Sequence, residues 1–214
     1  MKTCLILLLA AAGLNGAGDD FLRWDAKRAN AVLTAQRSEG RVGGALDLRV
    51  LRTDRSYNYK LRATWMTPEA IRAGARLEQL KKALTDQETL RLVADAESAG
   101  DTVIYVEVDP REGSGVIPND WTALLSPHAG SGNPLPGVRG TNTPRLRDLP
   151  ALAGYGRRDY AYDVFWVVFP LHTESGAPLF GEECREAELT VRIYDKAGRV
   201  RWRIPDSIRL KMRD

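Results

Sequence analysis

The segment ELTVRIYDKAGRVRWRI, residues 188–204, decides the fold class. Apolar and polar residues alternate on both sides of residues 195–198, which is typical of two antiparallel strands joined by a turn. If Tyr194 pairs with Arg199, one face of the hairpin is entirely apolar. The apolar pairs across the two strands are then Ile193 with Val200, Val191 with Trp202, and Leu189 with Ile204. We therefore predict a β-hairpin that packs its apolar face on a core.

A second hairpin is predicted from residues 46–50 and 57–65, which alternate in the same way around the loop 53–56. Pairing Arg52 with Tyr57 places all the apolar residues on one face. A slip of one residue would expose that face, so the pattern specifies the register strongly.

Three more strands follow from the apolar pattern. Residues 102–109 carry Ile104, Val106 and Val108 on one face, and residues 121–125 form a shorter strand. Residues 160–169 are apolar on both faces, which predicts a strand covered on both sides.

Two helices are predicted between the second and third strands. Thr67-Pro68-Glu69 supplies an N-cap, a proline at the first helical position and an acid in the first turn. Thr85 and Glu88 have the spacing of a capping box, so a second helix begins there. The pair spans residues 68–99, and another short amphipathic helix is predicted over 20–36.

These elements predict an α+β fold that is predominantly antiparallel β. We expect a sandwich or curled sheet of about six or seven strands, with the helical pair inserted between the second and third. An N-terminal helix and linker, 18–42, would precede a single strand-rich domain, 43–214. Segment 127–156 contains five prolines and six glycines and is predicted to be a long loop, a kind of segment that is often functional.

Residues 1–17 have the order of a secretory signal peptide: Lys2, an apolar run from Cys4 to Ala12, and small residues up to Ala17. The apolar run is about half the ~20 residues that a membrane span needs. We expect an exported protein, periplasmic or extracellular, with no stable membrane span after cleavage. Cleavage would leave Cys184 as the single cysteine, so no intrachain disulfide could form.

The charge balance excludes a dedicated nucleic-acid binder. The 31 basic residues less Lys2 leave 30 against 28 acidic ones, a net charge of +2 for the chain without its leader. The partners that remain are an anionic envelope component or another envelope protein.

No motif indicates a metal, a cofactor or a nucleophile. His128 and His172 are the first residues to consider, but the spacing of His172, Glu174, Glu182, Glu183 and Cys184 matches no zinc or hydrolase signature. Four carboxylates have the residue types of a glycoside hydrolase pair: Glu107, Asp109, Asp120 and Asp163. They leave one alternative open, a secreted hydrolase with its site under segment 127–156.

The outward faces of the two hairpins are the better candidates for a binding site. The predicted registers place Arg49 opposite Lys60, Arg62 opposite Asp47, and Arg192 opposite Arg201, with Arg203 on the same face. Like charges directly opposed across antiparallel strands are destabilising, and an anionic partner would offset them. The simpler explanation is that Glu188 or an adjacent strand neutralises them. We therefore expect an exported, non-enzymatic binding or structural module, with six candidate anion-binding residues: Arg49, Lys60, Arg62, Arg192, Arg201 and Arg203.

Overall fold

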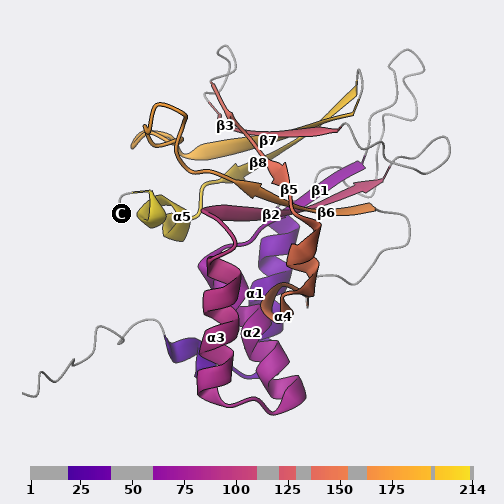
Figure 1. Ribbon diagram of the computed structural model, residues 1–214, viewed down its shortest axis with the longest axis vertical. Helices are drawn as coiled ribbons and strands as arrows, with labels where there is room; N and C mark the ends of the chain where they lie inside the picture. Colours follow the sequence, from indigo (N-terminus) through magenta and orange to yellow (C-terminus); the bar gives the residue numbers. More distant parts are fainter. Residues whose placement is uncertain are drawn as a thin grey trace, which may run out of the picture.

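The computed structural model describes residues 19–39, 60–109, 121–128, 136–153, 163–193 and 196–212. These residues form two antiparallel four-stranded sheets and a group of helices, so the α+β class and the antiparallel strands are confirmed. Eight strands are present in the described residues, against the six or seven expected. Figure 1 shows the sheets stacked above the helices.

Sheet A contains, in spatial order, β1 (Lys60–Trp65), β2 (Thr102–Asp109), β6 (Asp163–Phe169) and β5 (Thr141–Asn142). Sheet B contains β4 (Val138–Arg139), β3 (Thr122–Pro127), β7 (Glu186–Ile193) and β8 (Lys196–Arg203). The chain therefore passes from sheet B to sheet A between β4 and β5, at Gly140.

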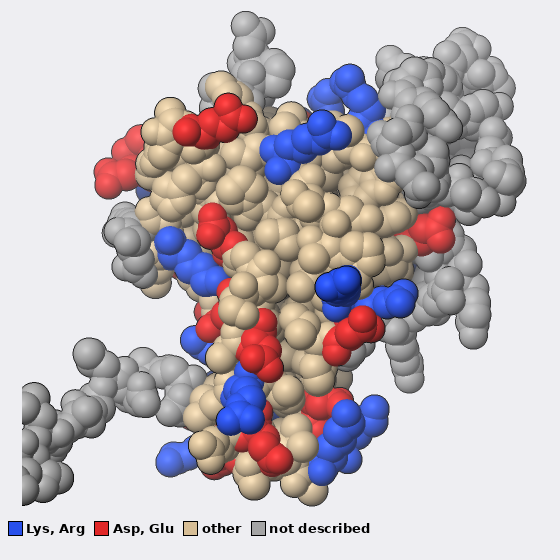
Figure 2. Space-filling view, in the orientation of Figure 1, with Lys and Arg blue, Asp and Glu red and all other residues tan. Residues whose placement is uncertain are grey.

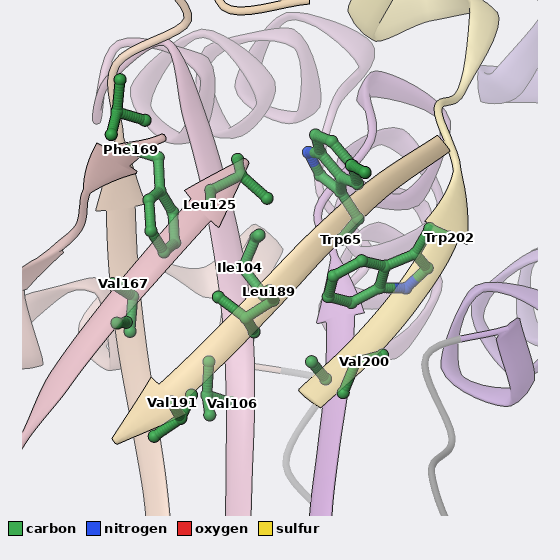
Figure 3. Packing of buried hydrophobic residues seen from close by; sticks show 14 of the residues in the cluster. Trp65, Ile104, Val106, Leu125, Val167, Phe169, Leu189, Val191, Val200 and Trp202 are labelled. Carbon is green, nitrogen blue, oxygen red and sulfur yellow. The ribbon is translucent and has the colours of Figure 1, made fainter. Parts of the chain in front are cut away.

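The two sheets face each other across one hydrophobic core (Figure 3). Sheet A contributes Ile104, Val106, Val167 and Phe169 from its central strands, and Trp65 from its edge. Sheet B contributes the predicted apolar face of the C-terminal hairpin: Leu189, Val191, Ile193, Val200 and Trp202 are all buried. The rings of Trp65 and Trp202 meet edge to face, with centroids 5.6 Å apart.

Helices cover the other face of sheet A. They are η1 (Asp19–Arg23), α1 (Ala26–Glu39), α2 (Pro68–Lys82), α3 (Asp86–Glu97), η3 (Pro144–Asp148) and α4 (Pro150–Ala153). A second core forms here around Val103, Tyr105 and Trp166 of sheet A, against Ile71 of α2 and Leu152 of α4. Strand β6 is thus covered on both sides, as its double-sided apolar pattern predicts. None of the helices described is long and apolar enough to cross a membrane.

The helical pair begins where its capping residues predict. The side chain of Thr67 accepts a hydrogen bond from the amide of Ala70, with Pro68 in the first turn. At Thr85 both halves of the capping box are present: Thr85 accepts from the Glu88 amide, and the Glu88 carboxylate accepts from the Thr85 amide at 2.7 Å. These bonds satisfy N–H groups that a helix start leaves unpaired.

The register predicted for the C-terminal hairpin is wrong by four residues. Leu189 lies opposite Val200, not Ile204, and Ile193 lies opposite Lys196. Because side chains alternate with a period of two, an even shift leaves the apolar face unchanged, so alternation cannot tell the two registers apart. Gly198, which we expected in the turn, lies within β8. Because it has no side chain, Leu61 of β1 can pack closely against it; a Cβ atom there would lie 3.1 Å from the Leu61 Cβ.

Segment 127–156, predicted to be a long loop, contains short elements in the part that the structure describes. Its described residues contain β4, β5, η3 and α4, and Pro144 and Pro150 each stand at the start of a helical turn. A short C-terminal helix, α5 (Asp206–Lys211), follows β8 and buries Ile208 in the core between the sheets. The first predicted hairpin strand, 46–50, lies outside the described residues.

Gly74 provides a test of the helical layer. A Cβ atom at this position of α2 would lie 2.1 Å from the carbonyl oxygen of Ala151 in α4. Gly to Ala normally stabilises a helix interior, but we expect Gly74→Ala to lower the free energy of unfolding by about 1–3 kcal/mol because the two helices must separate. Chemical denaturation measures this. Gly181→Ala, where a Cβ meets nothing within 4 Å, is the control, and equal stability of the two variants would contradict the close packing.

The capping box predicts a pH dependence. Hydrogen bonds donated by the backbone and side chain of Thr85 hold the pKa of the Glu88 carboxyl below its ordinary value. The stabilisation from ionised Glu88 is therefore present above the ordinary pKa and is lost as the pH falls through the lowered one. Thr85→Ala removes the hydrogen bond from the hydroxyl and keeps the one from the backbone amide, so we expect the pKa of Glu88 to rise part of the way toward the ordinary value, as measured by a carboxyl NMR titration. An unchanged pKa would mean that the Thr85 hydroxyl does not stabilise the carboxylate.

Candidate functional site

The outer face of sheet B is turned away from the core and from the helices (Figure 1). Its side chains are the ones that alternate with the buried residues of β3, β4, β7 and β8. This set, which we call the basic face, consists of Thr122, Leu124, Ser126, Arg139, Glu186, Glu188, Thr190, Arg192, Ala197, Arg199, Arg201 and Arg203. It contains five arginines and two glutamates. In the space-filling view, basic side chains lie over the region of sheet B at the top of the molecule (Figure 2).

Glu188 organises one half of the basic face. Its carboxylate accepts a hydrogen bond of 2.8 Å from Nε of Arg201, directly opposite on β8. Nε of Arg199 and Nδ1 of His128 each lie 3.8 Å from the same carboxylate. Arg203 lies opposite Glu186 in the register. In this half, Arg201 and Arg203 are matched by two carboxylates, so their positive charge is largely compensated.

The other half has no such compensation. Arg139, Leu124, Thr190 and Arg199 form one row across the four strands, and Arg192 stands in the next row. Within the described part of the chain, Arg139 and Arg192 make no hydrogen bond or salt bridge, and Arg199 has only the distant contact with Glu188 that it shares with Arg201. We call Arg139, Arg192 and Arg199 the arginine triad.

Leu124 lies between the members of the triad. It is 41% exposed, and it is the single large exposed hydrophobic residue on the basic face. Its neighbours in the row are Arg139 on one side and the hydroxyl of Thr190 on the other. The site therefore consists of an apolar and hydroxyl centre with guanidinium groups around it. Such an arrangement can bind an anion through charge-assisted hydrogen bonds while the centre contacts an apolar group.

The structure does not bring the six predicted anion-binding residues together. Arg192, Arg201 and Arg203 are on the basic face, but Arg192 lies opposite Ala197 and not opposite Arg201. Lys60 and Arg62 belong to β1 of sheet A, opposite Asp109 and Glu107. The neighbours of Arg62 along its side of β1 are Thr64 and Met66, and Met66 belongs to the core under the helices. Arg62 thus lies on the other side of the molecule, and Arg49 is outside the described residues.

The remaining sequence candidates do not converge on one site. His128 directly follows β3 and lies beside Glu188, whereas His172 lies exposed in a β-bridge with Pro178. Cys184 is partly buried and its Sγ lies 3.2 Å from the carbonyl oxygen of Glu186. Among the residues described, no group of three or more His, Cys, Asp or Glu side chains could hold a metal ion.

The described carboxylates considered for a hydrolase lie on the strands of sheet A. Glu107 is buried in β2, opposite Arg62 and Val164, and Asp163 begins β6; Asp120 is outside the described residues. Where segment 127–156 is described, Leu146, Ala151 and Leu152 are buried in the core under the helices. This part of the segment therefore contributes to the hydrophobic core, and none of its described residues forms an acid pair with these carboxylates.

Of the arginine triad, only Arg192 is among the six anion-binding candidates predicted from the sequence. Leu124 was expected only as part of a strand, and Arg139 as part of a loop. Strand β4 has just two residues, too few for any periodicity to reveal, and it places Arg139 directly opposite Leu124. Gly137, directly before β4, is a local sign that the chain approaches β3 closely here. A Cβ atom at this position would lie 2.6 Å from the carbonyl oxygen of Leu125.

Comparisons with known proteins add no further constraint. No family model matches the sequence, and neither the curated proteins nor the solved structures give a significant match. The geometry of the basic face is therefore the basis on which a function is proposed.

The register of the basic face predicts which charges are coupled. A double-mutant cycle on unfolding free energy with Glu188→Gln and Arg201→Gln should give a coupling of about 0.5–1 kcal/mol. The matched control, Glu188→Gln with Arg192→Gln, should give a coupling within experimental error, because Arg192 lies four residues away along β7. Repulsive coupling between Arg192 and Arg201 would instead support the register inferred from the sequence.

Proposed function

We propose that this protein is an exported, non-enzymatic binding module of the cell envelope or the secreted space, and that it binds an anionic partner through the basic face. The observation that carries the proposal is the arginine triad: three arginines around an exposed leucine, with one carboxylate of the described residues, that of Glu188, near a single member. In this proposal the stacked sheets are a β-sandwich, and α2 and α3 are an insertion between its second and third strands, with residues 46–50 counted as the first.

Electrostatics supports an anionic partner. Uncompensated like charges on one face repel each other and disfavour the folded state, and a bound anion removes that repulsion. Arginine is also the residue best suited to such contacts, because its planar guanidinium can donate two parallel hydrogen bonds to a carboxylate or phosphate. The compensated half, around Glu188, would contribute less to binding because Arg201 already donates to Glu188 and Arg203 lies opposite the acidic residue Glu186.

Export is supported by the order of residues 1–17, which is that of a signal peptide. Outside the cytoplasm, the available anionic partners include acidic envelope polymers, lipid headgroups and the acidic surfaces of other envelope proteins. The basic face has the chemistry to bind all of these. The exposed apolar side chain of Leu124 favours a partner that combines negative charge with an apolar group.

The proposal is tested by localising anion binding to the triad. We expect the variant Arg139→Gln/Arg192→Gln/Arg199→Gln to elute from immobilised heparin, used as a generic polyanion, at lower salt than the wild-type chain. Three contacts of about 0.5–1 kcal/mol each would correspond to a loss of affinity of roughly tenfold to a hundredfold.

The matched control removes three exposed cations elsewhere: Lys81→Gln/Arg91→Gln/Arg145→Gln, in α2, α3 and η3. It has the same net charge as the triad variant, so any non-local charge effect is equal in the two. If both variants elute at the same salt concentration, heparin binding reflects net charge alone and the proposal is wrong.

A further inference from the structure

The spacing of the triad indicates what kind of anion it fits. Arg139 and Arg199 end the same row of the basic face, on the outer strands β4 and β8. Neighbouring strands lie ~4.8 Å apart, so three strand spacings separate the two backbone positions by about 14 Å. The positions between them are Leu124 and Thr190. A ligand that lies along this row meets a cation, an apolar and hydroxyl centre, and a second cation.

An extended peptide has the complementary spacing. Its residues i and i+4 point to the same side and lie about 13–14 Å apart, with residue i+2 midway between them. A peptide with acidic residues at i and i+4 and an apolar residue at i+2 would set its carboxylates on Arg139 and Arg199 and its apolar side chain on Leu124. Arg192, in the adjacent row, would contact a further acceptor of the same segment.

We infer that the partner of the basic face is a protein that presents an extended acidic segment, with two acidic residues four positions apart and an apolar residue between them. This inference rests on the proposed function and specifies its ligand. An apolar centre within a charged rim, with arginine prominent, is the usual composition of a protein–protein interface.

Other anionic partners fit the basic face less well. Its outward residues include no aromatic side chain, which a polysaccharide would use as a stacking platform. Leu124 is the single large exposed hydrophobic residue there, so a lipid bilayer would gain little from inserted apolar surface. A small anion such as phosphate would leave Leu124 without an apolar contact.

Two capped peptides of identical composition test the inference. One contains Glu-Thr-Leu-Thr-Glu between serines; its isomer contains Thr-Leu-Glu-Glu-Thr, with adjacent acids. Binding to the full chain is followed by backbone amide NMR shifts. We expect the spaced peptide to bind about threefold or more tightly than its isomer, to shift the amides of Leu124 and Thr190, and to lose binding to the triad variant. Leu124→Ser should remove the preference for the spaced peptide, because the apolar contact at the centre is lost.

Parallel titrations with inorganic phosphate and with vesicles of phosphatidylglycerol and phosphatidylethanolamine complete the experiment. Equal binding of the two peptides overturns the spacing inference. Stronger triad-dependent binding of vesicles or phosphate than of either peptide overturns the peptide as ligand, while the proposed anion-binding function stands. If the triad variant binds every probe as the wild-type chain does, both the inference and the proposed function are wrong.

Discussion

The rest of the structure depends on one constraint: sheet A must be covered on both faces. Strands β2 and β6 carry apolar side chains on each side, with Ile104 and Val106 turned toward sheet B and Val103 and Tyr105 toward the helices. Exposing either face to water would forfeit the largest favourable contribution to folding. Two covering layers are therefore required, and sheet B and the helices provide them. Sheet B, as an outer layer, has one face left for water or a partner.

The close approach of the layers also positions part of the basic face. The chain leaves sheet B after β4 and enters sheet A at β5 through Gly140, where a Cβ atom would lie 2.4 Å from Val167 and 2.5 Å from Phe169. A larger residue at this crossing would push the two sheets apart. Because the crossing confines β4 to two residues beside β3, Arg139 comes to lie opposite Leu124. The close packing of the two sheets at Gly140 thus helps to determine where Arg139 lies on the surface.

The sequence patterns predict the local features of this structure but not the contacts between distant residues. Alternation identified which residues of the C-terminal hairpin are buried, and capping residues located the starts of α2 and α3. These signals are local, so the sequence carries them directly. The hairpin register is not local: two registers that differ by four residues bury the same face, and the choice depends on Gly198 packing on Leu61 and on Glu188 facing Arg201.

The candidate site was only half predictable for the same reason. Arg192, Arg201 and Arg203 lie on a strand face that alternation reveals, so they were found. Arg139 belongs to a two-residue strand within a segment rich in proline and glycine, and its position follows from contacts with β3 and not from its own neighbours in sequence. Arg62 lies in sheet A and not beside these arginines, a placement that could not be predicted because a hairpin pattern does not show which sheet each strand joins.

The two halves of the basic face offer an internal comparison. Both include residues of the paired strands β7 and β8, and β3 and β4 add Leu124 and Arg139 to one of them. In one half, Glu188 and Glu186 stand opposite Arg201 and Arg203, the mixture of charges usual for a soluble surface. In the other half, three arginines surround the exposed Leu124, and among the described residues Glu188 is the one carboxylate near any of them, 3.8 Å from Nε of Arg199. The first half thus resembles an ordinary soluble surface, whereas the second is the half for which we propose an anionic partner.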